Sequence, residues 1–262
     1  MKIILRYLKI WWLMSRNAFL AVLSQRIGFT IFLIGKILRF SLFFVFIIFL
    51  LKGTNSLAGY NLNQTLFFFL TFNLIDTISQ FLFREVYRFR PLVVSGSFDL
   101  VLTKPVSALF RSLMGGADVI DFVTIPFLIM AVIYIGKLLN PSTLGILYYI
   151  LLLFNGLILA TAFHIAVLAL GIITLEIDHT VMIYRDLTAL ARFPVDIYKE
   201  PIKGILTFLI PIGIMITLPA KALMGITSLM GVLWSLGLGG TALFLSLRFW
   251  KFALTKYTSA SS

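Results

Sequence analysis

The side chains that can do acid-base, nucleophilic or metal chemistry are few in this sequence. It holds two histidines, His164 and His179, ten acidic residues and no cysteine. A catalytic or metal centre needs several such groups to converge, and no spacing among these residues predicts one. The sequence also has no phosphate-binding loop of the form Gly-x-x-x-x-Gly-Lys-Ser/Thr. We therefore expect a non-enzymatic chain without a metal or cofactor of its own, in which any ATP and Mg²⁺ are bound by a partner.

The two histidines lie in different surroundings. His164 is inside a long apolar stretch, where a neutral, hydrogen-bonded residue at a helix interface is the favoured interpretation. His179 adjoins Glu176 and Asp178. That trio is typical of a solvated loop, and a proton-coupled site is the alternative.

Polar residues within apolar stretches are the better functional candidates. Asn73, Asp76 and Gln80 are spaced i, i+3 and i+7 and share one face of a helix. A carboxylate that faces lipid is costly, so these side chains should point into a helix bundle. Asp118 and Asp121 share a face of the next span, where Arg84, Arg88 or Arg111 are their expected partners.

The favoured interpretation of these polar residues is helix-to-helix ion pairing, and a translocation path is the alternative. The residues assigned to the path or the bundle interface are Phe72, Asn73, Asp76, Gln80, Asp118 and Asp121.

The composition predicts an integral membrane protein. Of 262 residues, 60% are hydrophobic and 12% are charged, which is about half the charge of a soluble domain. The net charge of +12 comes from basic residues scattered between apolar runs. A nucleic-acid binder would instead cluster them on one soluble face, so no nucleic-acid partner is expected.

Six runs are candidate membrane spans, and together they predict an all-α fold. A span needs about 20 apolar residues, and the candidates are residues 30–51, 65–83, 114–136, 144–175, a fifth discussed below, and 226–247. The fourth run is charge-free and about 48 Å long as a helix. We expect it to break near Gly156 or Gly171, or to project into water.

The fifth span has two interpretations. Hydropathy favours residues 204–220, but Pro211 and Pro219 predict a bent or re-entrant segment there. The alternative span, 179–193, contains Arg185, Asp186 and Arg192, which would then have to be packed inside protein.

Basic residues predict the orientation, because they are retained on the cytoplasmic side. They gather before the first span, between the second and third, and after the last, whereas the opposite loops hold only Lys52 and Lys137 nearby. Both termini are therefore expected in the cytoplasm. Residues 1–28 mix basic, aromatic and aliphatic side chains, which favours an interfacial elbow helix over an extension packed on the bundle.

The cytoplasmic segment 84–112 is too elaborate for a simple connector. Gly96 as a break, or Ser97 as a cap, predicts a short helix over 98–102 that stops before Pro105. Such a helix could dock in a groove of a soluble partner or lie on the lipid surface.

This segment and the C-terminal third resemble the permease subunits of ATP-binding-cassette type-2 exporters, in particular a bacterial family of permeases encoded in pairs beside one ATPase. The loop reads GSFDLVLTKPVSALF, in which Gly96, Asp99, Leu102, Lys104 and Pro105 match the family pattern. Later matches lie in the stretch from residue 192 to 220 and in the ending RFWKFALTKYTSAS. They include Arg192, Pro194, Tyr198, Leu206, Phe208, Pro211, Pro219 and Ala220.

The resemblance implies one six-span domain over residues 1–262 in the bacterial inner membrane. It implies partnership with a cytoplasmic ATPase subunit and with a second permease, identical or paired non-identical. The coupling helix would comprise Gly96, Phe98, Asp99, Leu102, Lys104 and Pro105. An outer-leaflet re-entrant segment over 194–225 would contain Pro194, Tyr198, Pro211 and Pro219. A proton-coupled secondary transporter and a non-transporting membrane scaffold remain the alternatives.

Overall fold

The computed structural model describes residues 2–175 and 177–258, so Met1, Glu176 and residues 259–262 lie outside it. Within this part the chain is all-helical, and its β contact is a single isolated bridge between Leu57 and Tyr60. This agrees with the all-α prediction.

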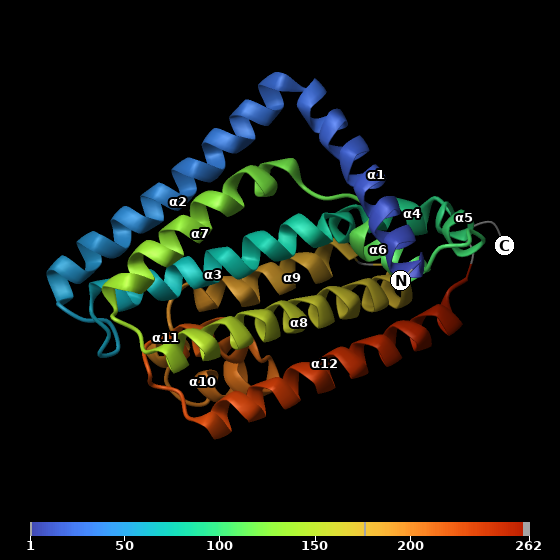
Figure 1. Cartoon of the computed structure of the whole chain (residues 1–262). Coiled ribbons are helices and arrows are strands. Elements are labelled where there is room, and N and C mark those ends of the chain that lie inside the picture. Colours follow the sequence, from blue (N-terminus) through green and yellow to red (C-terminus); the bar gives the residue numbers. More distant parts are fainter. Residues whose placement is uncertain (1, 176, 259–262) are drawn as a thin grey trace.

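Five helices are long and apolar enough to cross a membrane (Figure 1). They are α2 (Arg26–Thr54), α3 (Leu62–Phe83), α7 (Val119–Leu138), α8 (Thr143–Thr174) and α12 (Leu229–Lys256). A bent pair, Ile202–Leu209 and Gly213–Leu223, is a sixth candidate if it counts as one span. The chain is thus a multi-pass bundle of five or six candidate spans.

Shorter elements connect or flank these helices. They are α1 (Lys2–Ser24), η1 (Arg84–Arg88), α4 (Phe89–Val94), α5 (Phe98–Leu102), α6 (Ala108–Met114), α9 (Ile177–Ala189), η2 (Leu190–Arg192), η3 (Val195–Ile197), α10 (Ile202–Gly204), η4 (Ile205–Leu209), η5 (Gly213–Thr217) and α11 (Leu218–Leu223). The η4 and η5 segments are π-helical.

Side-chain caps define where several helices begin. Asn61 and Gln64 form a reciprocal capping box at α3. Asp118 accepts hydrogen bonds from the backbone N–H groups of the first turn of α7, and Ser142 and Ser228 each cap the helix that follows them. These caps satisfy backbone donors that the helices themselves leave unpaired.

Two expectations about the spans differ from the structure. The fourth span is one continuous helix, α8, so the break expected near Gly156 or Gly171 is wrong, and the alternative that the helix projects into water stays a prediction. A Cβ on Gly156 would lie 2.5 Å from the Met215 carbonyl oxygen, so this glycine serves close packing of α8 against η5. The third span begins at Val119, because residues 108–114 form the separate helix α6.

The region of the fifth span contains both candidate segments. The α9 helix has 13 residues and is about 20 Å long, too short to cross a bilayer alone. Its Arg185 and Asp186 are exposed in the chain. The 179–193 interpretation requires its charged residues to be packed inside protein, and within this chain only Arg192 is even half-buried. The bent pair turns by 77° at the break that contains Pro211, so the interruption predicted from this proline is present.

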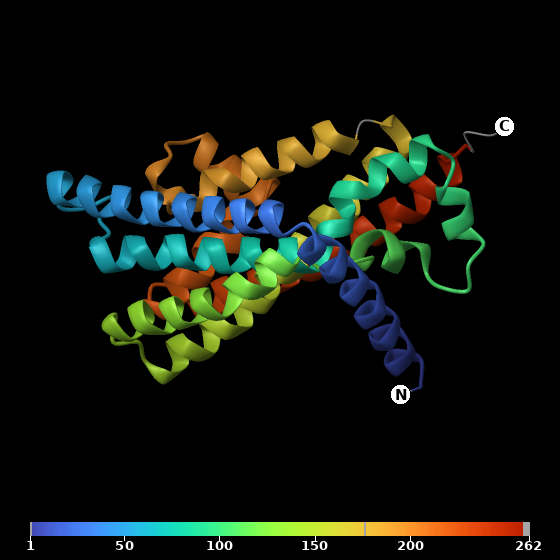
Figure 2. The same ribbon diagram turned by 90° about the horizontal axis from the view of Figure 1, so that it is seen from above.

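The bundle has two distinct ends. Figures 1 and 2 show α4, α5 and α6 near the C-terminal end of α12, whereas the loops that join α2 to α3 and α7 to α8 lie at the other end. The start of α1 contacts the segment between α5 and α6. Between the ends, α8 lies along α12 and α3 packs on α7. Asn155 on α8 ties the first of these pairs by donating to the backbone oxygen (2.9 Å) and hydroxyl (2.8 Å) of Ser235.

Candidate functional site

The short helix α5 is anchored by one buried aromatic side chain. Phe98 is fully buried and packs against the rings of Phe89, Trp250 and Tyr257, with centroid distances of 5.1, 6.4 and 5.2 Å. Trp250 belongs to α12 and Tyr257 directly follows it. The connector between α3 and α7 is therefore fixed to the last helix of the bundle. The predicted helix over 98–102 is confirmed.

The other side of α5 faces outward. Leu100 is 64% exposed and Leu102 41%, and Lys104 and Pro105 beyond them are exposed as well. Asp99 is half-buried. The side chains left free for a partner are thus mainly leucines and a lysine.

The start of α5 depends on Gly96 and not on Ser97. Gly96 has φ of 73°, a conformation that favours glycine, whereas the Ser97 side chain caps no helix. Of the two starts considered from sequence, the glycine break is the correct one.

Asp99 of α5 also affects Tyr257, the residue that directly follows α12. Burial, and then the Asp99 carboxylate, raise the pKa of Tyr257.

The N-terminal helix α1 also holds the connector. Arg6 donates to the Pro105 carbonyl oxygen at 3.0 Å, and the Ser107 backbone N–H donates to the Tyr7 hydroxyl at 3.1 Å. The Tyr7 ring stands edge-on to Phe110, with centroids 4.7 Å apart. Sequence reasoning did not link residues 100 positions apart, and no local pattern marks this pairing.

Ion pairs fix the helices near this end, and one was assigned incorrectly from sequence. Arg84 pairs with Asp118 at 3.1 Å, as expected. Asp121 pairs with Lys36 of α2 and with none of the three arginines proposed. Lys36 and Asp121 are 85 positions apart, so only the tertiary packing of α2 on α7 brings them together.

The polar face of α3 is satisfied largely within its own helix. Asn73 donates to the Phe69 carbonyl oxygen at 2.7 Å, and Gln80 donates to the Asp76 carboxylate, also at 2.7 Å. Asp76 additionally interacts electrostatically with Arg39 and other basic residues. The hydrogen bonds of Asn73 and Gln80 are therefore within α3 and are not the helix-to-helix pairing expected from sequence.

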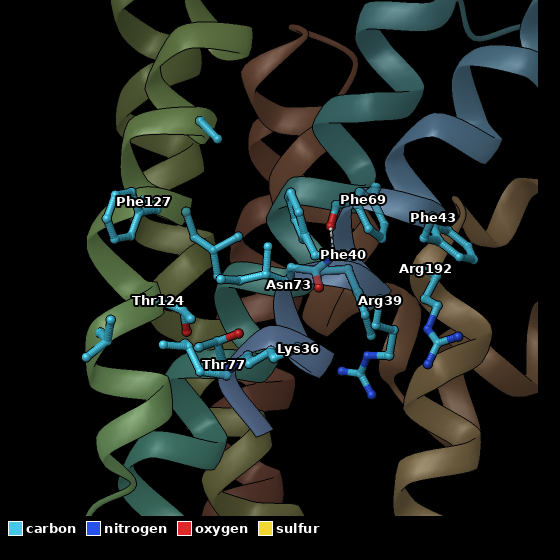
Figure 3. A pocket seen from close by; sticks show the side chains of 16 residues that line it. Lys36, Arg39, Phe40, Phe43, Phe69, Asn73, Thr77, Thr124, Phe127 and Arg192 are labelled. Carbon is cyan, nitrogen blue, oxygen red and sulfur yellow. Dashed lines mark hydrogen bonds between the residues drawn. The ribbon is translucent and has the colours of Figure 1, made fainter. Parts of the chain in front are cut away.

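A cavity of about 480 Å³ lies between α2, α3 and α7 (Figure 3). Most of its wall is apolar, and cationic side chains occur at Lys36, Arg39 and Arg192. Of the path residues expected from sequence, the cavity contains Phe72 and Asn73. The remaining four expected path residues do not line it, namely Asp76, Gln80, Asp118 and Asp121. Lys36 and Arg39 are one turn apart at the start of the first span. This pair of cations on one helix face is the sequence feature that could have indicated a cationic cavity wall on α2.

The segment before the last span is tied to the far end of the bundle through Asp196. This carboxylate pairs with Lys203 at 2.9 Å and Lys221 at 2.5 Å, and accepts a hydrogen bond from Tyr60 at 3.0 Å. Burial acts to raise the pKa of Asp196, but the lysine and tyrosine hydrogen bonds outweigh it and hold the pKa below its ordinary value. The Tyr198 hydroxyl donates to the Leu190 carbonyl oxygen at 2.8 Å.

The proline positions of this segment also have clear structural roles. Pro194 is buried and precedes η3. Pro219 is buried near the point where the π-helical η5 passes directly into α11. Pro211 lies in the bend of the pair. These residues shape the backbone, and none has chemistry of its own.

The two histidines lie in different helices, and His179 is exposed near the start of α9, not in the loop expected for it. In the part of the chain that is described, no three His, Cys, Asp or Glu residues come together as a metal site. The buried His164 ring bonds the Ala160 carbonyl oxygen through Nδ1 at 2.7 Å and contacts Phe83 and Tyr184. This matches the interpretation of a helix-interface residue.

A family model described as ABC-2 family transporter protein matches residues 37–261. The chain belongs to the ABC-2 transporter family. No curated protein and no solved structure matches it. The resemblance to type-2 permeases is confirmed, and this ABC-2 permease is a multi-pass membrane transport protein of a family whose members are typically non-enzymatic and associate with an ABC ATPase.

Proposed function

We propose that this ABC-2 permease is a subunit of an exporter in a bacterial inner membrane, driven by a separate cytoplasmic ATP-binding-cassette ATPase. A second permease subunit, identical or non-identical, completes the path. ATP and Mg²⁺ bind to the ATPase, because this chain has no phosphate-binding loop. ATP-driven closure of the ATPase pair displaces the connector and shifts the bundle between two states.

The observation that carries this proposal is the build of α5. The buried face of α5 packs on the aromatic cluster around Phe98, while Leu100 and Leu102 face outward. Short helices with exposed apolar side chains are suited to docking in a groove. Because Phe98 is buried, it acts as the anchor of the coupling helix. Partner contact then falls on the outward leucines, Lys104 and Pro105.

The distribution of charge supports a cytoplasmic location for this end. Basic residues on α1, on the connector and in the last turns of α12 gather at the end of the bundle where Figure 1 shows α4 to α6. The α1 helix exposes large apolar side chains such as Ile3 (72%), Leu8 (56%) and Trp12 (59%). These support its role as an interfacial elbow helix on the inner leaflet.

The segment 194–225 is proposed as the outer-leaflet re-entrant part. Its 77° bend and its ties through Asp196 to the loop between α2 and α3 support this assignment. The substrate path would then run along the polar face of α3, with Phe72, Asn73, Asp76 and Gln80 nearest to it. Asp118 and Asp121 stabilise the bundle interface through their ion pairs.

The direct test is copurification of an ATPase subunit from native membranes. Leu100→Asp places a charge on the outward face of α5 and should abolish copurification and ATP-dependent transport. The matched control is Thr143→Asp, which adds the same charge at an exposed helix start at the opposite end of the bundle. Equal retention of the ATPase by both variants would refute the coupling helix.

Topology can be tested separately because the chain has no cysteine. We expect a single cysteine at Lys104 to resist a membrane-impermeant maleimide applied to intact cells, and one at Thr143 to react. Labelling of position 104 from outside would overturn the orientation. Transport that depends on a proton gradient without any ATPase would indicate a secondary carrier instead. Copurified partners without transport would indicate a scaffold.

A further inference from the structure

The cavity between α2, α3 and α7 has the size of a ligand site. Its volume of about 480 Å³ lies in the range of about 300 to 1,000 Å³ typical of small-molecule pockets. The α2 helix forms one wall and is otherwise mostly exposed, so the cavity lies beside the lipid-facing side of the bundle.

One part of the cavity wall is aromatic. Phe69 of α3 stacks on Phe40 and on Phe43 of α2, with ring centroids 5.3 and 4.9 Å apart, and Phe127 of α7 lies on the opposite wall (Figure 3). These rings make an apolar slot between the three helices. Such a slot suits an alkyl chain or a flat apolar group.

The other part is cationic. Arg39 and Arg192 line the cavity from α2 and η2, and Figure 3 shows both guanidinium groups on the same side of it. The Arg192 guanidinium lies over the Phe43 ring, 5.6 Å from its centroid. Among the described residues, neither arginine has a carboxylate at salt-bridge distance, whereas Lys36 beside them is paired with Asp121.

The charge around these arginines is unbalanced. Of the side chains that the structure describes, Arg192 interacts electrostatically with one carboxylate, Asp76, and with two other cations, Arg39 and Arg185. The same Asp76 also interacts with Arg39, so the two cavity arginines share one carboxylate. Cations inside a membrane protein are costly unless an anion neutralises them. A positively charged group next to an apolar slot therefore favours a ligand that carries both an anionic and an apolar part.

We propose that this cavity binds an anionic amphiphile. Its phosphate, sulfonate or carboxylate head lies between Arg39 and Arg192, and its apolar part lies among Phe40, Phe43 and Phe127. Planar guanidinium groups suit such heads because they donate two parallel hydrogen bonds. That this ligand is the transported substrate class rests on the proposed function.

The test measures binding to the full chain in a nonionic detergent by native mass spectrometry. The probes are dodecyl phosphate, phosphatidylglycerol and, as the cationic counterpart, dodecyltrimethylammonium. We expect one dodecyl phosphate or one phosphatidylglycerol per chain, at least about tenfold tighter than the cation. Preference for phosphatidylglycerol would identify the bilayer as the source, and preference for dodecyl phosphate a smaller amphiphile.

Variants locate the site. Arg39→Gln and Arg192→Gln should each weaken binding by about ten- to a hundredfold, and Ala131→Phe should weaken it by filling the apolar part. The matched control is Arg248→Gln, since Arg248 lies over the Phe244 ring of α12, 5.2 Å from its centroid, outside the cavity.

Equal binding of the cationic and anionic probes would overturn the proposal. The proposal would also be overturned if Arg39→Gln and Arg192→Gln weakened binding of the anionic probes no more than Arg248→Gln does. The measurement needs no ATPase. Its failure is therefore distinct from a failure of coupling, which is read from copurification with the Leu100→Asp variant.

Discussion

Gly239 lies where α12 packs against α8, and an added methyl group there should lower the stability of the chain. A Cβ at this position would lie 2.0 Å from the Asn155 side-chain oxygen. Asn155 is 2% exposed and bonds Ser235 twice. Gly239→Ala must therefore displace a buried amide from its hydrogen bonds, even though alanine is the better helix former.

The magnitude follows from these two effects. Loss of the hydrogen bonds of a buried amide costs about 1 to 3 kcal/mol, against a gain of up to about 1 kcal/mol in helix propensity. Taking the middle of each range, about 2 kcal/mol lost and about 0.5 kcal/mol gained, the net loss is about 1.5 kcal/mol. This corresponds to a drop in Tm of roughly 3 to 6 °C for a chain of this size. Gly237→Ala and Gly240→Ala meet no atom within 4 Å, so these controls should be neutral or slightly stabilising.

The assay is thermal unfolding of the full chain in detergent, followed by tryptophan fluorescence. A double-mutant cycle tests the cause, because Gly239→Ala should lose its effect when Asn155 is already alanine. The reasoning fails if Gly239→Ala is as stable as Gly240→Ala. It also fails if the effect of Gly239→Ala persists unchanged in the Asn155→Ala background.

Three further predictions concern the ion pairs and the anchor of α5. Lys36→Ala leaves Asp121 buried and unpaired and should cost about 2 to 4 kcal/mol in unfolding experiments, whereas replacing both residues by apolar ones should restore most of the loss. The lowered pKa of Asp196 contributes stability above the ordinary aspartate pKa of about 4. That stability should be lost as pH falls below this value, and the loss should be absent in Asp196→Asn when Tm is followed from pH 6 to 3. Trp250→Ala removes a ring that packs on Phe98, so hydrogen exchange over residues 98–102 should accelerate without a matching change in α8.

The features that were predictable from sequence are those whose cause is local. Gly96 marks the start of α5 because the left-handed backbone there favours glycine. The spacing of Asn73, Asp76 and Gln80 places them on one helix face. Pro211 interrupts its segment because proline cannot continue a helix.

The features that sequence reasoning missed arise from contacts between distant segments. Lys36 reaches Asp121 only because α2 packs on α7. The length of its apolar run predicts a break in α8 as one of two outcomes, with Gly156 or Gly171 as the candidate position. Here Gly156 instead admits the Met215 carbonyl oxygen to close contact. Such roles are set by the neighbouring element, which no local pattern encodes.

The position of α1 has a mechanical consequence. Its Arg6 and Tyr7 hold the backbone at Pro105 and Ser107, and a single residue, Gln25, separates it from α2. The α2 helix, which forms one wall of the cavity, is thus joined to the connector through α1, with a break in the helix at Gln25. If a bound ATPase displaced α5, α1 would transmit the movement to α2 and so to the cavity between α2, α3 and α7. This route does not involve the tightly packed pair of α8 and α12.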